Sequence, residues 1–239
     1  MASEKVYSKF SATKKDGTVV NLYIAQIEEE QKKDFLELYI SHFVKEESTF
    51  RAAGVHKSAR ALAEFRQAVN HRLSNDCFKI VVCCLNNEGE ENRIIGGSIM
   101  ELTTPEEYLS NSFQPKADEQ RKLFEVYGDM VESYDVMKAF KMEQYFVDRG
   151  VVVHPDFRGL GIAQELFKVR RMQCKDHGVP IHGAWMTSYG TQKAGERDGW
   201  ITVFEIDYED LGKKHGVTFK KGPPTCQYMI ARIDLDKEI

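Results

Sequence analysis

Residues 151–163, with the sequence VVVHPDFRGLGIA, constrain the fold of this chain more than any other stretch. Three consecutive valines favour an extended strand, Pro155 ends it, and two glycines then permit a tight turn. The amphipathic segment 164–174 that follows has the periodicity of a helix. The sequence therefore predicts a strand, a turn and a helix N-terminus in this order. Backbone N–H groups and the positive end of the helix dipole meet at such a turn, so it suits a phosphate group.

Two common phosphate-binding loops do not match this turn. Gly159 and Gly161 match the first two glycines of the dinucleotide fingerprint G-x-G-x-x-G, but Gln164 stands at the position of its third glycine. A Walker loop requires Gly-Lys-Ser or Gly-Lys-Thr, which the stretch lacks. The turn does contain the pattern Arg-x-x-Gly-x-Ala, formed by Arg158, Gly161 and Ala163. The alternative interpretation is an ordinary strand–turn–helix in which Gly159 serves only the bend.

Composition and charge exclude several classes of protein. A chain of 239 residues, 42% of them hydrophobic, can form one large domain or two small ones with a packed core. No apolar run approaches the ~20 residues of a membrane span, and the start of the chain leads into no apolar segment of a signal peptide. A net charge of −4 gives no electrostatic reason to bind nucleic acid. We therefore expect neither membrane nor nucleic-acid partners.

The cysteines and histidines argue against a disulfide framework and against a metal site. Five cysteines, an odd number, occur without CxxC spacing. None of the seven histidines stands at metal-ligand spacing from a cysteine or a carboxylate. Cys83 and Cys84 lie in an apolar run, where reduced cysteine packs as a small hydrophobic residue. We expect a reduced, cytoplasmic protein without a bound metal.

Periodicity along the rest of the chain predicts a mixed α/β fold. The polar and acidic stretch 103–141 is expected to be a helical insert that begins at Thr104-Pro105. The pair Gly96-Gly97 inside a strand predicts a bulge or a close backbone approach, and a turn is expected at 86–89. Strands are expected at 18–24, 78–85, 93–102, 150–154, 181–186, 200–206 and 227–233, and helices at 28–44, 58–73, 159–177 and 191–198.

This order of elements predicts one central sheet of mixed but mostly antiparallel strands with flanking helices. The strands 150–154 and 181–186 are joined through the helix 159–177, which makes them a parallel pair in the middle of the sheet. Two parallel strands that splay beside each other leave a cleft. The phosphate-type turn lies at the C-terminal end of the first of them, where ligands bind in open α/β sheets.

These features together resemble the GNAT acyltransferases and, more narrowly, the insect arylalkylamine N-acetyltransferases. The pattern Arg-x-x-Gly-x-Ala after Val-Val-Val-His-Pro is similar to motif A of that superfamily, which holds the pyrophosphate of acetyl-CoA. The likeness covers most of the chain. It is carried further by the helix 35–44 that runs into Lys45-Glu46-Glu47-Ser48, by MTSYGT at 186–191, by GERDGW at 195–200, and by Tyr208 with Pro223-Pro224.

The resemblance implies a GNAT fold in a single domain over residues 1–239, with the helical insert at about 103–141. It implies an enzyme that transfers acetyl from acetyl-CoA, its co-substrate, to the primary amine of a small arylalkylamine such as dopamine, tyramine or serotonin. The amine would attack the thioester directly, without an acyl-enzyme. We expect a monomer or a weak dimer whose partners are the amine and acetyl-CoA.

The resemblance also implies which residues bind the donor. A backbone N–H of the strand 151–153 would face the thioester oxygen, while the valine side chains belong to the strand core. Arg158 would add a charge-assisted contact, and its alternative is a solvated arginine. Lys168, Arg170 and Arg171 would either reach the nucleotide end or form a solvated helix face. The expected cofactor-binding residues are Val151, Val152, Val153, Arg158, Gly159, Leu160, Gly161, Ile162 and Ala163.

The general base that the resemblance implies is Glu47. It stands at the end of the first predicted helix, where the insect group has its acidic residue. A carboxylate there would accept a proton from the attacking amine and attract a cationic substrate. Glu46 is the adjacent alternative. His42 is a further possible base, although its place on the apolar stripe of the helix favours a core or pocket-lining role.

The general acid is expected in the hydroxyl-rich turn after the strand 181–186. Thr187 and Thr191 match the hydroxyl pair of the insect group, and Ser188 lies between them. Tyr189 is an alternative, since a phenol is closer in acidity to a thiol. For Ser188 and Thr191, capping of the following helix is the competing interpretation.

The chain departs from the insect group at three places near the expected amine pocket. Ser48-Thr49 replaces proline–leucine, Asp198 stands where leucine is common, and Thr225 where histidine is frequent. The resemblance therefore defines the amine substrate less closely than it defines the fold or the acetyl donor. The alternatives are a polyamine or agmatine-like cation, which the acidic insert would attract, and a non-catalytic sensor of acyl-CoA.

Overall fold

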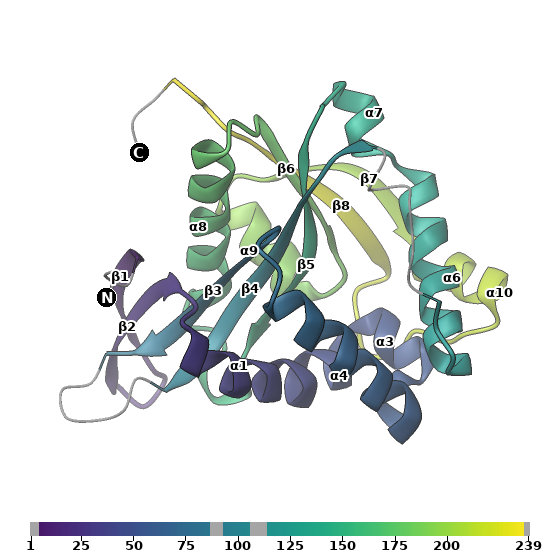
Figure 1. Ribbon diagram of the computed structural model, residues 1–239, viewed down its shortest axis with the longest axis horizontal. Coiled ribbons are helices and arrows are strands. Elements are labelled where there is room, and N and C mark those ends of the chain that lie inside the picture. Colours follow the sequence, from purple (N-terminus) through teal and green to yellow (C-terminus); the bar gives the residue numbers. More distant parts are fainter. Residues whose placement is uncertain (1–4, 87–92, 106–113, 237–239) are drawn as a thin grey trace.

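The computed structural model describes residues 5–86, 93–105 and 114–236 of the chain. Two antiparallel sheets with helices packed around them make up the fold (Figure 1). The first has the strand order β1-β2-β3-β4-β5 and the second β6-β8-β7. Their strands are β1 (Val6–Thr13), β2 (Val19–Gln26), β3 (Phe78–Leu85), β4 (Ile94–Thr103), β5 (Tyr145–Val153), β6 (Ile181–Met186), β7 (Ile201–Asp207) and β8 (Thr225–Arg232).

The first helical segment is continuous but changes its winding. Helix α1 (Lys32–Leu38) passes through a π-helical turn, Tyr39–Phe43, into α2 (Val44–Glu46). Short 3-10 turns occupy Glu29–Gln31, Val55–Lys57 and Pro155–Phe157. The other helices are α3 (Ser48–Ala53), α4 (Ala59–Leu73), α6 (Asp118–Ser133), α7 (Val136–Phe140), α8 (Ile162–Asp176), α9 (Tyr189–Arg197) and α10 (Tyr208–His215).

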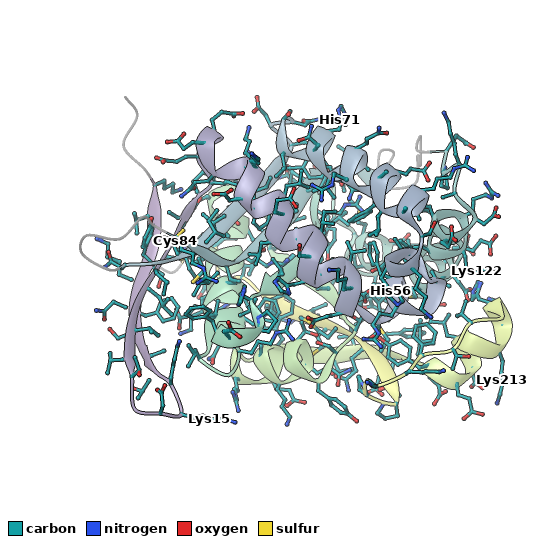
Figure 2. The ribbon with its side chains drawn as sticks, turned by 90° about the horizontal axis from the view of Figure 1, so that it is seen from below. Lys15, His56, His71, Cys84, Lys122 and Lys213 are labelled. Carbon is teal, nitrogen blue, oxygen red and sulfur yellow. The ribbon has the colours of Figure 1, made fainter. Side chains whose placement is uncertain are left out.

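The five-stranded sheet is covered by helices on both faces. Along β3, Ile80, Val82 and Cys84 belong to a core shared with α1 and α4. Val81 and Cys83 point the other way, into a core shared with α8. Figure 1 shows α1 and α4 together on one side of the sheet and α8 on the other, and Figure 2 labels the fully buried Cys84. Burial on both faces explains why this strand is an unbroken apolar run.

The predicted single central sheet is divided in two between β5 and β6. The two strands are neighbours, and α8 connects them. At their junction the Tyr145 hydroxyl of β5 donates to the carbonyl oxygen of Gly183 in β6 and accepts from its N–H at 2.9 Å. A side chain therefore occupies the backbone groups of Gly183 that a continuous sheet would pair with β5. Tyr228 of β8 extends this contact, with its hydroxyl 2.8 Å from that of Tyr145.

Most predicted elements are confirmed. β3 and β6 have the predicted bounds, and Ser58 and Ser188 cap α4 and α9 with their side chains. At Gly96-Gly97 both predicted features occur: β4 has an irregular register with β3 beside Gly96, and a Cβ on Gly97 would lie 2.6 Å from the Phe35 ring. The turn predicted at 86–89 and the helix start predicted at 104–107 extend into residues outside the described part of the chain.

Three elements were not predicted, and β5 begins earlier than expected. β1 pairs only with β2 and has no fully buried residue, so its sequence lacks a clear apolar face. α3 has only six residues, and α10 contains mostly charged residues around Leu211 and Gly212. β5 starts at Tyr145 instead of residue 150. The prediction began too late because the charged residues Asp148 and Arg149 interrupt the apolar pattern inside the strand.

Candidate active site

The turn after β5 has the geometry of an open anion cradle. Gly159 and Gly161 have φ values of +80° and +79°, a region that glycine adopts without strain. An added Cβ at either position would meet no described atom within 4 Å. Gly161 is the N-cap of α8 and provides no side-chain hydrogen bond to the first turn of this helix. The first N–H groups of α8 are thus available to an anion at the positive end of the helix dipole.

The Arg158 side chain joins this turn to the end of the first helical segment. One guanidinium nitrogen lies 2.6 Å from a Glu46 carboxylate oxygen, and Nε donates to the carbonyl oxygen of Val153 at 3.1 Å. About half of the side chain is exposed. Arg158 is therefore paired rather than merely solvated, and it lies beside the glycine turn. Leu160 and Ala163 pack against the core, and Ile162 is buried in it.

The three valines before the turn differ in where their backbone groups point. The N–H of His154 donates to the carbonyl oxygen of Ile95 in β4 at 2.8 Å. Because successive residues of a strand alternate, the N–H of Val152 also faces β4, and those of Val151 and Val153 face the opposite edge. The carbonyl oxygen of Val153 lies on that opposite edge as well, where it accepts from Arg158. The side chains of all three pack in the core.

A bulge in β5 immediately precedes these valines. Val151 is aligned with Ser98 of β4, and Asp148 with Met100, so β5 has one extra residue. Gly150 has a φ of +113°, and a Cβ there would lie 2.7 Å from both the Phe43 ring and the Tyr39 hydroxyl. The Tyr39 hydroxyl donates to the carbonyl oxygen of Arg149. The π-helical turn thus packs its aromatic side chains directly on the bulge.

Glu47 separates α2 from α3 and caps α3. Its Oε2 accepts from the backbone N–H groups of Thr49 and Phe50, at 2.8 and 2.9 Å, and from the Thr49 hydroxyl. Its Oε1 is buried and has no hydrogen-bond partner among the described residues. A buried carboxylate oxygen without a donor is costly. This atom is therefore suited to accept a hydrogen bond from a ligand.

Aromatic side chains pack against one another near Glu47. The rings of Tyr39 and Phe43 stack at 4.5 Å, and Phe50 packs edge-on against Phe43 at 5.5 Å and against Tyr127 of α6 at 6.3 Å. Burial, followed by the nearby charge of Glu47, raises the pKa of Tyr127 well above its usual value. A neutral phenol therefore lies near the Glu47 carboxylate, as part of a group of packed aromatic rings.

The end of β6 is held next to Glu47. The carbonyl oxygen of Thr187 accepts from the Ser48 hydroxyl at 2.8 Å and from the Tyr208 hydroxyl at 2.9 Å. Thr187 is buried. The structure thus brings together two predicted regions, the acidic pair and the hydroxyl-rich turn, that are far apart in the sequence.

Ser188 and Thr191 form a capping box at the start of α9. Ser188 Oγ accepts from the N–H of Thr191 at 3.2 Å, Thr191 Oγ1 accepts from the N–H of Ser188 at 3.3 Å, and the two hydroxyl oxygens are 3.0 Å apart. The capping interpretation of these residues is therefore confirmed. Tyr189 is 55% exposed and lies outside the buried group around Glu47.

The other predicted alternatives have structural partners. The ring of His42 packs on His154 at 4.9 Å, and burial followed by the His154 charge lowers the pKa of His42. Arg170 is fully buried, which contradicts both the nucleotide contact and the solvated face considered for it. Lys168 pairs with Glu165, and Arg171 with Asp198. Cys83 is fully buried, and burial raises the pKa of its thiol far above the usual range.

The described residues contain neither a cluster of metal-ligand side chains nor a helix of membrane-spanning type. No group of three or more His, Cys, Asp or Glu side chains in the described ranges is arranged to hold a metal ion. Within the same residues, no helix has the length and apolar character of a membrane span.

Comparison with solved structures identifies the architecture. A protein assigned as arylalkylamine N-acetyltransferase 7 from the yellow fever mosquito Aedes aegypti superposes with a TM-score of 0.84 and 20% sequence identity, covering 97% of this chain and 96% of its own. A polyamine N-acetyltransferase of Drosophila melanogaster gives 0.64 and 16%, covering 89% and 100%. A GNAT superfamily phosphinothricin acetyltransferase from Sinorhizobium meliloti, in complex with acetyl-CoA, gives 0.52 and 13%, covering 89% and 88%. The chain has the GNAT fold. No family model matches its sequence.

The GNAT fold accounts for the predicted strand–turn–helix and for the neighbouring β5 and β6. Several residues around Glu47 were not predicted as part of the site. Tyr39 and Phe43 lie in the predicted helix 28–44, whose periodicity indicates only an apolar face. Tyr127 lies in the insert 103–141, whose composition predicts only a polar, acidic helical segment. The spacing of Tyr39 and Phe43, one helical turn apart, was the one available indication that they act together.

Proposed function

We propose that this protein is an acetyl-CoA-dependent N-acetyltransferase that acts on the primary amine of a small arylalkylamine such as dopamine, tyramine or serotonin. The open glycine turn at the N-terminus of α8 supports acetyl-CoA as the donor. Residues 1–239 would act as one domain, as a monomer or weak dimer in the cytoplasm. The GNAT fold is compatible with this activity, and the likeness to other GNAT structures favours it.

The observation that carries the proposal is the unpartnered Oε1 of Glu47. A second carboxylate oxygen that is buried and receives no donor from the described protein matches an ammonium or amine N–H. The first oxygen is already fixed by three donors, so the carboxylate is held in one orientation. Glu46, the alternative base, is engaged with Arg158 beside the glycine turn. This division of partners favours Glu47 on the acceptor side.

In the proposed reaction each region has one task. The turn at Gly159–Gly161 and the first N–H groups of α8 hold the pyrophosphate, with Arg158 adding charge. Glu47 takes a proton from the amine whose nitrogen forms the new C–N bond. The N–H of Val151 donates to the thioester oxygen, which gains negative charge. Thr187 donates a proton to the sulfur as the C–S bond breaks, and the proton that Glu47 took from the amine restores the Thr187 hydroxyl. Ser188 and Thr191 would first have to release their capping hydrogen bonds, so Thr187 is preferred.

The surroundings of Glu47 favour an aromatic acceptor over a polyamine. Stacked and edge-on rings lie in the segments on either side of Glu47, and such rings pack well against an aromatic substrate. The acids of α6, which would attract a second cationic group, are largely engaged already. Asp118 pairs with Arg121, Glu125 with Lys122, and Asp129 with Lys214 and His215 of α10. Figure 2 shows Lys122 and Lys213, from α6 and α10, at the same end of the molecule.

A side-by-side acceptor assay tests the proposal. Purified protein with acetyl-CoA is given tyramine, dopamine, serotonin, spermidine and agmatine, and release of CoA is followed. We expect the highest kcat/KM with the three arylalkylamines. Higher values with spermidine or agmatine would replace the arylalkylamine by a polyamine. Saturable binding of acetyl-CoA without turnover on any amine would instead indicate an acyl-CoA sensor.

A further inference from the structure

Arg170 and Asp148 form a buried clamp around the bulge of β5, and we propose that this clamp fixes the direction of the Val151 N–H. Neither residue would touch a substrate, so both are positioning residues. The inference rests on the proposed function, because it is the thioester oxygen that the Val151 N–H would bind. It adds to that function two positioning residues, one of which lies in the middle of α8.

The hydrogen bonds of Arg170 converge on the backbone of the bulge. Nη2 donates to Asp148 Oδ1 at 2.6 Å and to the carbonyl oxygen of Gly150 at 3.0 Å. Nε donates to Ser98 Oγ of β4 at 2.6 Å. Asp148 Oδ1 also accepts from the N–H of Gly150 at 2.9 Å. The two side chains together hold the N–H and the carbonyl oxygen of the same glycine.

Holding the Gly150 carbonyl fixes the Val151 N–H directly. The two groups belong to one planar trans peptide, in which C=O and N–H point in opposite directions. With the carbonyl oxygen drawn toward Arg170 and β4, the N–H of Val151 faces the other edge of β5. The alternation of the strand gives the same direction independently, from the His154 N–H bond to Ile95. A charged donor on the carbonyl also polarises the peptide and strengthens its N–H as a donor.

The opposite side of the bulge is restrained as well. The Tyr39 hydroxyl donates to the Arg149 carbonyl oxygen, and the Tyr39 hydroxyl and Phe43 ring leave no room for a Cβ on Gly150. Gly150 can therefore keep its positive φ, which other residues adopt only with strain. The bulge lies between the π-helical turn and Arg170, and neither the peptide nor its N–H is free to rotate.

A structural role alone gives a weaker account of Arg170. The side chain has no exposed surface, and its Nη1 has no hydrogen-bond partner among the described residues. Burying a guanidinium is costly, and a well-packed apolar side chain of similar size often gives equal or greater stability. The hydrogen bonds of Arg170 Nη2 and Nε, which hold the bulge in place, explain why a charged residue occurs at this position.

The test compares Arg170→Met with Arg171→Met, the next residue of α8, which loses the ion pair to the buried Asp198 without touching the bulge. The main readout is the carbonyl stretch of the thioester in bound acetyl-CoA, measured by infrared difference spectroscopy with labelled acetyl. Wild type and Arg171→Met are expected to show the same shift to lower frequency. Arg170→Met should lose most of this shift and lower kcat about 10- to 100-fold. The Kd for CoA should change by less than about threefold, since the substitution leaves the glycine turn and the first N–H groups of α8 in place.

An unchanged carbonyl band in folded Arg170→Met, or equal loss in both variants, would overturn the inference. Where Arg170→Met does not fold, Arg170→Lys is measured in the same way. An ammonium cannot reproduce the fork that joins Asp148, Gly150 and Ser98, so a wild-type band in the lysine variant counts equally against the clamp. An unshifted band in wild type with acetyl-CoA bound also overturns it. Failure of wild type to bind acetyl-CoA at all would refute the proposed function instead.

Discussion

Glu47 caps α3 and is also the proposed general base, and substitutions can separate these two roles. Oε2 caps α3, and Oε1 is buried without a described donor. Glu47→Ala removes both the cap and the proposed base. Glu47→Gln keeps an amide oxygen that can accept from Thr49 and Phe50, but it removes the basic carboxylate. The two variants should therefore have similar chemical defects and different stabilities.

The expected magnitudes follow from these contacts. Loss of a helix N-cap typically lowers the free energy of unfolding by about 0.5–2 kcal/mol, and we expect this from Glu47→Ala. Glu47→Gln should lose less than about 0.5 kcal/mol, since the cap acceptor remains. Loss of general base catalysis lowers kcat by about 10²- to 10⁴-fold, and we expect a fall in this range from both variants. The fall should be largest at acidic to neutral pH, where more of the amine is protonated.

Three measurements on the same preparations test this reasoning. Tyramine turnover is followed from pH 6 to about pH 9, urea unfolding gives the free energy of unfolding, and calorimetry gives the Kd of acetyl-CoA. Glu46→Gln is the matched control, because it removes the adjacent carboxylate and its Arg158 pair but leaves the cap and Oε1 intact. We expect Glu46→Gln to change the Kd of acetyl-CoA more than it changes kcat, since Glu46 contacts Arg158 beside the glycine turn.

A Glu47→Gln variant with full kcat across the pH range would remove Glu47 from the mechanism. A Glu47→Ala variant as stable as wild type would show that the capping hydrogen bonds contribute little. Loss of acetyl-CoA binding in either variant would place Glu47 on the donor side and contradict its separation from the Arg158 turn.

Three further predictions concern the donor turn, the kinetic route and a buried histidine. Gly161→Ala should raise the Kd of acetyl-CoA in calorimetry while leaving the amine KM nearly unchanged, because a φ of +79° strains alanine; an unchanged Kd would argue against the cradle. Bisubstrate kinetics should give intersecting lines, as direct attack requires, and parallel lines would indicate an acyl-enzyme. Burial lowers the pKa of His182 well below its usual value, so below about pH 6.5 the unfolded chain binds a proton that the folded protein does not, and stability falls by up to about 1.4 kcal/mol per pH unit. His182→Phe should remove this slope between about pH 6.5 and pH 5 in urea unfolding; parallel curves for the variant and wild type would refute it.

Local signals predicted the fold well wherever residues are buried on a regular pattern. β3 and β6 have the predicted bounds, since both are apolar runs between clear turn residues. β1 and α10 were missed because their stability comes from a neighbour. β1 completes a sheet edge on β2, and α10 is held by Lys214 and His215 against Asp129 of α6. Such partners are not visible in a local window of sequence.

The sequence predicts several individual segments of the candidate site, but not the long-range contacts that join them. The glycine turn could be predicted because positive φ values select glycine directly. The position of Arg170 could not, since a basic residue on an amphipathic helix is usually solvated. Its burial depends on a bulge in β5 and on Ser98 of β4, which lie 20 or more residues away. At the division between β5 and β6, likewise, the Tyr145 hydroxyl contacts Gly183, which lies 38 residues away.

Ser48-Thr49, one of the places where the sequence departs from the insect group, adds two hydroxyl hydrogen bonds at the acidic end of the first helical segment. A proline–leucine pair would offer neither a side-chain donor nor, at the proline, a backbone N–H. In this chain the Thr49 hydroxyl gives Glu47 Oε2 an additional donor, and the Ser48 hydroxyl reaches the Thr187 carbonyl. One substitution pair thus fixes the proposed base and ties it to the strand end that carries the proposed acid. The Ser48 and Thr49 hydroxyls therefore help to determine how the proposed base and the proposed acid are held relative to each other.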